Sequence, residues 1–131
     1  MQQILFALVE NKPGVLTRVA SLFRRRKFNI ESLNVGRTEI PGISRMTIVL
    51  DHETADARLV EANLYKLVNV IDVQDLTNQP AVIRDLALIK VKASPEQRSE
   101  IASLTDIFRA NIVDVAYDSV VVEITGTESK I

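Results

Sequence analysis

The chain has 131 residues, of which 47% are hydrophobic and 25% charged, a composition typical of a soluble globular protein rather than a disordered one. Its 16 basic and 17 acidic residues leave a formal net charge of −1, which argues against nonspecific binding to nucleic acid or anionic lipid. It contains 0 cysteines, so disulfides, thiolate metal sites and cysteine nucleophiles are excluded, and a cytoplasmic location is expected.

The amino terminus shows no targeting signal. Residues 1–3 lack the charged region of a signal peptide, and no apolar run approaches the roughly 20 residues that span a bilayer. We therefore expect neither export nor membrane association.

Residues 1–38 predict a strand, a helix and a second strand. The apolar run from Ile4 to Val9 predicts a central strand buried on both faces, and residues 10–14 form a turn. A helix is predicted to begin with Pro13 at its first position, because apolar residues then recur at helical spacing at Leu16, Val19, Ala20 and Phe23. Residues 28–38 predict the next strand, with a bulge near Ser32 and Leu33.

Residues 45–76 complete the first unit. Alternating apolar residues at 45–50 predict a strand that pairs with the preceding one as a hairpin. A helix follows, with apolar positions at Ala57, Val60, Leu64 and Leu67, and residues 70–76 predict the last strand. The fold class is therefore α+β, with a ferredoxin-like βαββαβ unit over residues 1–78.

Residues 79–131 repeat the beginning of this pattern. Residues 86–92 predict a strand, and Ser94, Pro95 and Gln97 predict a capped helix whose buried side carries Ile101, Leu104 and Phe108. Strands are predicted at 112–117 and 120–125. The second domain is therefore expected to be an incomplete, truncated ferredoxin-like βαββ unit that lacks its last helix and strand.

The sequence offers no constellation for catalysis or metal binding. His52 is the only histidine, and we expect it in a solvated loop, with an interface contact or a pH-sensitive contact as the alternatives. The acids near it flank a helix start, where the helix dipole alone favours them.

A basic cluster at residues 24–27 raises the question of nucleic-acid binding, because RNA-recognition domains share this topology. Those domains stack bases on aromatic residues of their central strands. In this chain the predicted central strands carry aliphatic residues, and Phe6 is their one aromatic residue. A solvated helix end, where cations complement the dipole, is the favoured interpretation.

The segment from Asn11 to Val15 is the most informative. It places Gly14 and unpaired backbone N–H groups at a helix start with no acidic side chain beside the glycine, an arrangement that favours a carboxylate or phosphate. A plain strand-to-helix turn is the alternative that spacing alone leaves open.

Several motifs resemble the small regulatory subunit of acetolactate synthase, also called acetohydroxyacid synthase, whose first half is an ACT domain. In the first half these are Asn11-x-x-Gly14-x-Leu16-x-Arg18-Val19, Leu22-Phe23, Arg26, Asn29-Ile30-Glu31-Ser32-Leu33 and Ser44-Arg45-Met46-Thr47-Ile48. In the second half they are Ile107-Phe108-Arg109-Ala110, Ile112-Val113-Asp114-Val115 and Glu123-Ile124-Thr125-Gly126-Thr127. The resemblance covers nearly the whole chain.

This resemblance implies a noncatalytic protein that binds and activates the large catalytic subunit and confers feedback inhibition by a branched-chain amino acid, commonly valine. It implies a homodimer of ACT domains with the effector between them, and Asn29 and Ile30 then come from the partner chain. The implied effector site comprises Asn11, Pro13, Gly14, Val15, Leu16, Asn29 and Ile30. Cofactors are expected only in the large subunit, as thiamine diphosphate, magnesium and FAD.

The chain departs from the family pattern in two places. Lys27 stands where the family usually has a glycine that ends the first helix, so a left-handed cap there carries modest strain. Family members also usually extend beyond the position of Ile131, so the resemblance implies that the second domain is incomplete.

Two other function classes remain as alternatives. One is a stand-alone ACT amino-acid sensor that regulates another enzyme or a transcription factor. The other is a small enzyme of acylphosphatase type, which needs an arginine in the first loop where this chain offers only Lys12. Valine, leucine and isoleucine differ by a methylene or its placement, so residue types alone do not select among them.

Overall fold

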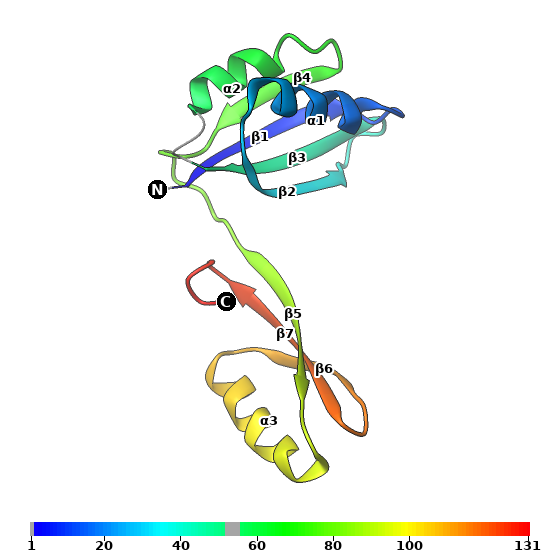
Figure 1. Ribbon diagram of the computed structural model, residues 1–131, viewed down its shortest axis with the longest axis vertical. Coiled ribbons are helices and arrows are strands. Elements are labelled where there is room, and N and C mark those ends of the chain that lie inside the picture. Colours follow the sequence, from blue (N-terminus) through cyan, green and yellow to red (C-terminus); the bar gives the residue numbers. More distant parts are fainter. Residues whose placement is uncertain (1, 52–55) are drawn as a thin grey trace. The chain divides into compact units, whose positions relative to one another are not determined.

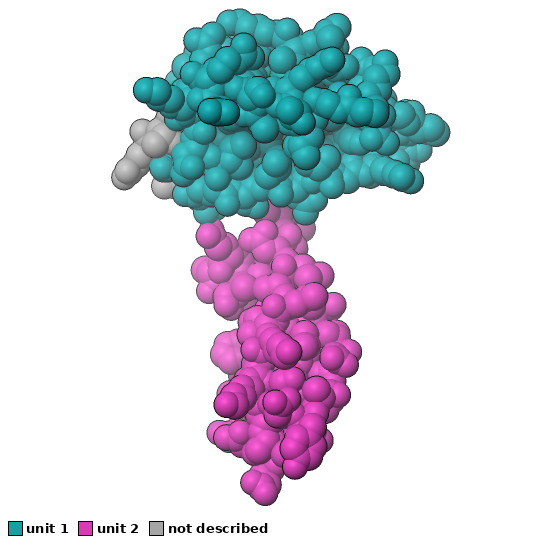
Figure 2. Space-filling model, turned by 45° about the vertical axis from the view of Figure 1, so that its right-hand side comes forward, with its two compact units in different colours: residues 1–81 teal, residues 82–131 magenta. Residues whose placement is uncertain are grey.

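The computed structural model describes residues 2–51 and 56–131, and it divides into two compact units, residues 1–81 and 82–131 (Figure 2). His52, for which a solvated loop was predicted, lies outside the described residues. In the part of the chain that is described, no helix has the length and apolar character needed to span a membrane.

The first unit has the predicted order of strands and helices. Four antiparallel strands form a sheet in the order β2-β3-β1-β4, and the helices α1 and α2 cover one of its faces (Figure 1). The elements are β1 (Gln3–Glu10), α1 (Val15–Arg26), β2 (Ile30–Arg37), β3 (Ile43–Leu50), α2 (Ala57–Leu64) and β4 (Val70–Asp75). This is the ferredoxin-like βαββαβ arrangement.

Strand β1 lies at the centre of this sheet but is buried on one face only. Leu5, Ala7 and Val9 point into the core beneath the helices, whereas Phe6 and Leu8 on the opposite face are partly exposed. The guanidinium of Arg45 lies 4.7 Å from the centroid of the Phe6 ring, a cation–π contact on the open face. The prediction of a strand buried on both faces was therefore wrong, because both helices pack on the same side of the sheet.

Helix α1 begins two residues later than predicted. Gly14 is its N-cap, with φ 86° and ψ −9°, so Pro13 lies in the preceding turn and not at the first helical position. At the other end, Lys27 caps the helix in the left-handed conformation with φ 57° and ψ 31°. The left-handed cap considered for Lys27 is thus present, although lysine has the Cβ that disfavours it.

Strand β2 forms an edge of the sheet and includes the predicted bulge, because the register with β3 shifts between Ile30 and Ser32. Leu33 and Val35 pair with Ile48 and Met46, so they lie on the helix-covered face. Both are nevertheless 41% exposed, whereas Ile48 and Met46 are fully buried. The two helices therefore cover the middle of the sheet and leave the β2 edge open.

Helix α2 ends at Leu64, and the side chain of Tyr65 links the turn after the helix to β4. Asp56 caps α2 by accepting a hydrogen bond from the Arg58 N–H at 3.0 Å. The Tyr65 hydroxyl accepts from the Val73 N–H at 2.9 Å. Leu67, predicted as a helical position, lies beyond the helix but still packs partly buried against the core.

The second unit is a three-stranded antiparallel sheet in the order β5-β7-β6 with one long helix, α3. Its elements are β5 (Asp85–Lys92), the short 3-10 helix η1 (Pro95–Gln97), α3 (Arg98–Ile107), β6 (Asn111–Val115) and β7 (Ser119–Gly126). The predicted capping box of Ser94 and Gln97 is present and begins η1, which leads into α3. These elements reproduce the first part of a ferredoxin-like unit.

The buried side predicted for α3 is only partly buried. Leu104 and Phe108 are 50% and 52% exposed, although both face the sheet of their own unit. A single helix covers only part of a sheet this wide, so these side chains line an open apolar surface. Correct helical spacing thus predicted the direction of these side chains but not their burial.

Replacing Lys27 by glycine should stabilise the first unit. Glycine adopts positive φ without the steric penalty of a Cβ. After the entropic cost of the more flexible unfolded chain is subtracted, the free energy of unfolding should rise by about 0.5–1 kcal/mol. Urea unfolding measures the difference. Lys27→Ala is the control, because it removes the charge and keeps the strain; equal stability of the two variants would contradict the argument.

The backbone of the second unit should open more readily than that of the first. Its sheet has one helix and an exposed apolar face, so fewer contacts oppose local unfolding. Hydrogen exchange followed by mass spectrometry should show the amides of β5, β6 and β7 exchanging well before those of β1 and β3. Equal protection of the two sheets would count against this expectation.

Candidate functional site

The candidate effector site is the turn that joins β1 to α1, and backbone hydrogen bonds hold it from two sides. The Glu10 N–H donates to the Asn69 carbonyl at 2.9 Å, and the Asn11 N–H donates to the Gly42 carbonyl at 2.8 Å. The turn is therefore anchored both to the segment before β4 and to the loop before β3.

The start of α1 is an uncapped helix end. No side chain caps it, and its first turn carries no acidic residue. The Val15 N–H donates to the Lys12 carbonyl and the Arg18 N–H to the Gly14 carbonyl, which leaves the N–H groups of Leu16 and Thr17 without a backbone acceptor among the described residues. Such N–H groups, together with the positive end of the helix dipole, favour an anion.

Gly14 gives the turn its left-handed backbone conformation and leaves open space beside it. Its φ of 86° is readily adopted by glycine, and a Cβ added there would meet no heavy atom within 4 Å. Gly14 is also exposed, so a ligand can approach the backbone of the first turn from solvent.

The charges beside this turn are mostly positive. Arg18 donates a hydrogen bond to the Asn69 side-chain oxygen, and the Lys12 ammonium lies 2.6 Å from the Glu10 carboxylate. Hydrogen bonding and charge from Lys12 lower the pKa of Glu10, with smaller contributions from Asn69 and Arg18. Lys12 is thus paired with Glu10, whereas Arg18 is held by Asn69.

Five of the seven predicted site residues lie together in this turn and helix start, from Asn11 to Leu16. Asn11, Pro13, Gly14 and Leu16 are exposed, whereas the Val15 side chain is buried in the core and contributes only backbone to the surface. Gly42, Arg18 and Asn69 also lie at this turn, and none of the three was predicted as a site residue. Gly42 comes just before β3, and nothing in the spacing of the sequence shows that it contacts Asn11.

Asn29 and Ile30 do not join the other five within one chain. Ile30 pairs with Leu50, which pairs with Gln3 at the start of β1, whereas Gly14 follows Glu10 at the end of β1. At about 3.3 Å per residue, these two ends of β1 are separated by about 23 Å. A site that uses both groups of residues therefore needs a second copy of the chain.

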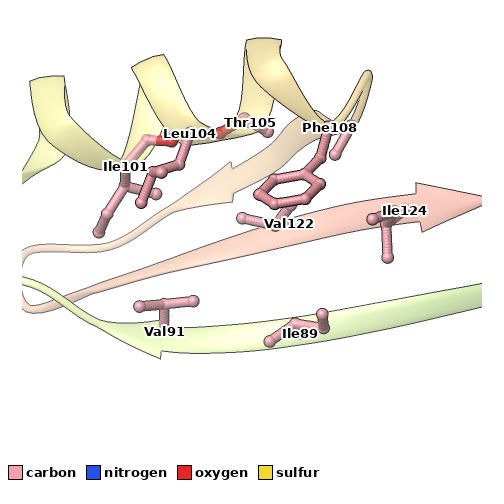
Figure 3. A pocket seen from close by; sticks show the side chains of 9 residues that line it. Ile89, Val91, Ile101, Leu104, Thr105, Phe108, Val122 and Ile124 are labelled. Carbon is pink, nitrogen blue, oxygen red and sulfur yellow. Dashed lines mark hydrogen bonds between the residues drawn. The ribbon is translucent and has the colours of Figure 1, made fainter. Parts of the chain in front are cut away.

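The second unit carries an open apolar cleft between α3 and the sheet (Figure 3). Side chains from α3 and from strands β5 and β7 face one another across it. The lining residues are Ile89, Val91, Ile101, Leu104, Thr105, Phe108, Ala110, Val122 and Ile124. Thr105 is the one polar residue of this set, and its hydroxyl donates to the Ile101 carbonyl within α3, so the cleft is suited to apolar contact and not to chemistry.

Neither unit contains a recognisable metal site within the described residues, where no group of three or more His, Cys, Asp or Glu side chains is arranged to hold an ion. The effector-site turn likewise offers backbone donors and amide groups but no pairing of a nucleophile with a base.

Comparison with known proteins assigns both units. A model described as the AHAS small subunit-like ACT domain matches residues 5–72, and one described as the small subunit of acetolactate synthase matches residues 84–131. The chain belongs to the acetolactate synthase small-subunit family. The resemblance in the sequence motifs is thereby confirmed.

Individual members of the acetolactate synthase small-subunit family agree over the whole chain. A probable acetolactate synthase small subunit of Archaeoglobus fulgidus is 53% identical over all of this chain and 82% of its own length. The acetolactate synthase small subunit of Bacillus subtilis is 46% identical over all of this chain and 77% of its own length.

A crystal structure of the acetolactate synthase small subunit from Thermotoga maritima supports the fold. It superposes with a TM-score of 0.89 at 42% identity and covers 99% of this chain and 81% of its own. An ACT domain from the GTP pyrophosphokinase of Chlorobium tepidum, at a TM-score of 0.50 and 18% identity, shares the fold of 60% of this chain. The predicted fold class is thus confirmed for this family member.

The stability that Glu10 contributes should be lost at low pH. Because its folded-state pKa lies below the ordinary value of 4.5, the carboxylate favours folding above that value and ceases to do so as the pH falls through the lowered one. In urea titrations we expect wild type to be more stable than Glu10→Gln at pH 7, and the difference to shrink as the pH falls below 4.5. A difference that persists undiminished at pH 3 would refute this.

Proposed function

We propose that this chain is a noncatalytic regulatory subunit of acetolactate synthase that binds a branched-chain amino acid, commonly valine, beside Gly14. The observation that carries the proposal is the uncapped start of α1, where a left-handed glycine precedes the N–H groups of Leu16 and Thr17, which have no backbone acceptor among the described residues. Membership of the small-subunit family supports the same conclusion.

Each part of a free amino acid has a suitable counterpart in the proposed site. The carboxylate accepts hydrogen bonds from the N–H groups of the first turn, near Leu16. The ammonium donates to amide oxygens such as those of Asn11 and Asn29. The aliphatic side chain packs against apolar residues, with the exposed Leu16 from one chain and the partly buried Ile30 from the other.

The proposed site is completed by a homodimer of ACT domains. Strand β2 is an edge with free hydrogen-bonding groups and two half-exposed apolar side chains, so it can pair with the β2 of a second copy. Antiparallel pairing about a twofold axis sets the beginning of one β2 beside the end of the other. Asn29 of the partner subunit then approaches the Gly14 turn, which accounts for the separation of these residues within one chain.

The remaining partner in this proposal is the large catalytic subunit. The family name denotes a small subunit, which implies a larger one that carries the chemistry. Thiamine diphosphate, magnesium and FAD are expected in that subunit and not in this chain, and the complex is expected in the cytoplasm. No nucleic acid or membrane is expected to take part.

A stand-alone ACT sensor is the alternative, and reconstitution distinguishes the two functions. Adding this protein to the matching large subunit should raise acetolactate formation, and valine should then inhibit it. A chain that binds valine without altering the activity of the large subunit would instead be a sensor for another target.

Gly14→Asp should abolish valine inhibition while preserving activation. The new carboxylate repels that of valine by up to about 4 kcal/mol at 4 Å and an effective dielectric of 20, so affinity should fall at least about tenfold. Gly14→Asn is the matched control, because it has a similar shape and the same backbone strain without the charge. Inhibition curves and calorimetry on both variants measure the effect. Equal loss in the two would mean that charge is not the cause.

Substitution at the β2 edge should disrupt both the dimer and valine binding. Val35→Lys places a charge where the two edges meet, whereas Leu59→Lys makes the same kind of change on α2, where Leu59 is 53% exposed. Sedimentation at micromolar concentration should show Val35→Lys as a monomer with weak valine affinity and Leu59→Lys as a dimer. A monomeric wild type with full valine affinity would exclude the shared site.

A further inference from the structure

Another cleft, lined mainly by charged and polar residues, lies between α1 and the end of α2 in the first unit. It has a volume of about 380 Å³, within the range of small-molecule sites. Its lining comprises Leu22, Arg25, Arg26, Asn63, Lys66 and Leu67. Three of these residues are cationic and none is acidic, so the cleft carries a concentrated positive charge.

Asn63 is the unusual member of this set. Only 2% of its surface is exposed, and its side-chain nitrogen donates to the Leu59 carbonyl at 2.8 Å. Its side-chain oxygen has no hydrogen-bond donor among the described residues. Flipping the amide would set this oxygen against the Leu59 carbonyl, so the orientation is fixed. A buried acceptor without a donor is rare, because leaving it unpaired is unfavourable.

The three cations have no acidic partner within the described residues, where the ion pair found joins Lys12 and Glu10. The dipoles of α1 and α2 favour cations near the ends of both helices, which explains the presence of each one in its own element. They do not explain why Arg25, Arg26 and Lys66 line a single cleft together with Asn63, whose side-chain oxygen lacks a donor among the described residues. An anion that also carries a hydrogen-bond donor would satisfy both features.

We propose that this cleft binds a phosphate group that presents a hydroxyl beside its charge. The charged oxygens accept hydrogen bonds from Arg25, Arg26 and Lys66, and the hydroxyl donates to the Asn63 oxygen. Inorganic phosphate at neutral pH has both groups, as does a small phosphorylated metabolite with a neighbouring hydroxyl. Sulfate has the charge and the shape but no donor.

This site is separate from the effector site at the other end of the same helix. Gly14 precedes α1, and Arg25 lies in its last turn, so at 1.5 Å per residue the two positions are about 16 Å apart. Phosphate and valine therefore do not compete for the same groups. The proposal stands whether or not valine is the effector.

Calorimetric titration with phosphate and with sulfate, in a phosphate-free buffer at matched ionic strength, tests the proposal on the intact protein. Phosphate should bind about tenfold more tightly than sulfate, because only phosphate pairs with Asn63. Glycerol 3-phosphate in parallel identifies the source: tighter binding than phosphate assigns the cleft to a phosphorylated metabolite, and weaker binding assigns it to free phosphate.

Four variants identify the site. Arg25→Gln and Lys66→Gln should weaken both anions, and Asn63→Ala should remove the preference for phosphate over sulfate. Arg24→Gln is the matched control, because it makes the same change one residue away without lining the cleft, and it should bind both anions as wild type does.

Equal affinity of wild type for phosphate and sulfate would overturn the proposal. An equal loss in Arg24→Gln and Arg25→Gln would also overturn it, since that result means attraction by the general basic surface. Circular dichroism checks the fold of Asn63→Ala. Should that variant unfold, the anion affinities of Arg24→Gln and Arg25→Gln still test whether the cleft is the site, because neither side chain is part of the core.

Discussion

The position of β1 between β3 and β4 is the constraint on which the first unit depends. Its backbone pairs on both sides, and Leu5, Ala7 and Val9 supply the middle of the core. A slip of one residue would move these side chains to the open face and bring Phe6 and Leu8 beneath the helices. The same register fixes where β1 ends, and through the bonds from Glu10 and Asn11 it fixes the turn that precedes α1.

Patterns that depend on nearby residues predicted most of the fold. Hydrophobic spacing was sufficient for the order of elements, and the change of phase near Ser32 was sufficient for the bulge in β2. The start of α1 was predicted too early because proline suits both a first helical position and a turn, and only the positive φ of Gly14 distinguishes them. The exposure of Leu104 and Phe108 could not be predicted from spacing, because burial depends on what else covers the sheet.

The two proposed binding sites also differ in how far local sequence patterns could predict them. The effector-site turn is nearly continuous in sequence, so a glycine next to a helix start was enough to suggest it. Its support from Arg18 and Asn69 was missed because those residues are about 50 positions apart and meet only through the fold. The cleft around Asn63 has no local signal at all, since the basic run at residues 24–27 and the single Lys66 each have an ordinary explanation within their own helix.

The central place of β1 also bears on the order in which the chain acquires structure during synthesis. Within this unit β1 leaves the ribosome before the other elements, because its partner β3 begins at Ile43 and its other partner β4 at Val70. The most apolar strand of the unit is thus produced long before anything can pair with it, and its contacts are mostly distant in sequence. Protection of this nascent segment falls to chaperones or to transient contacts with α1, which is the first element able to shield it.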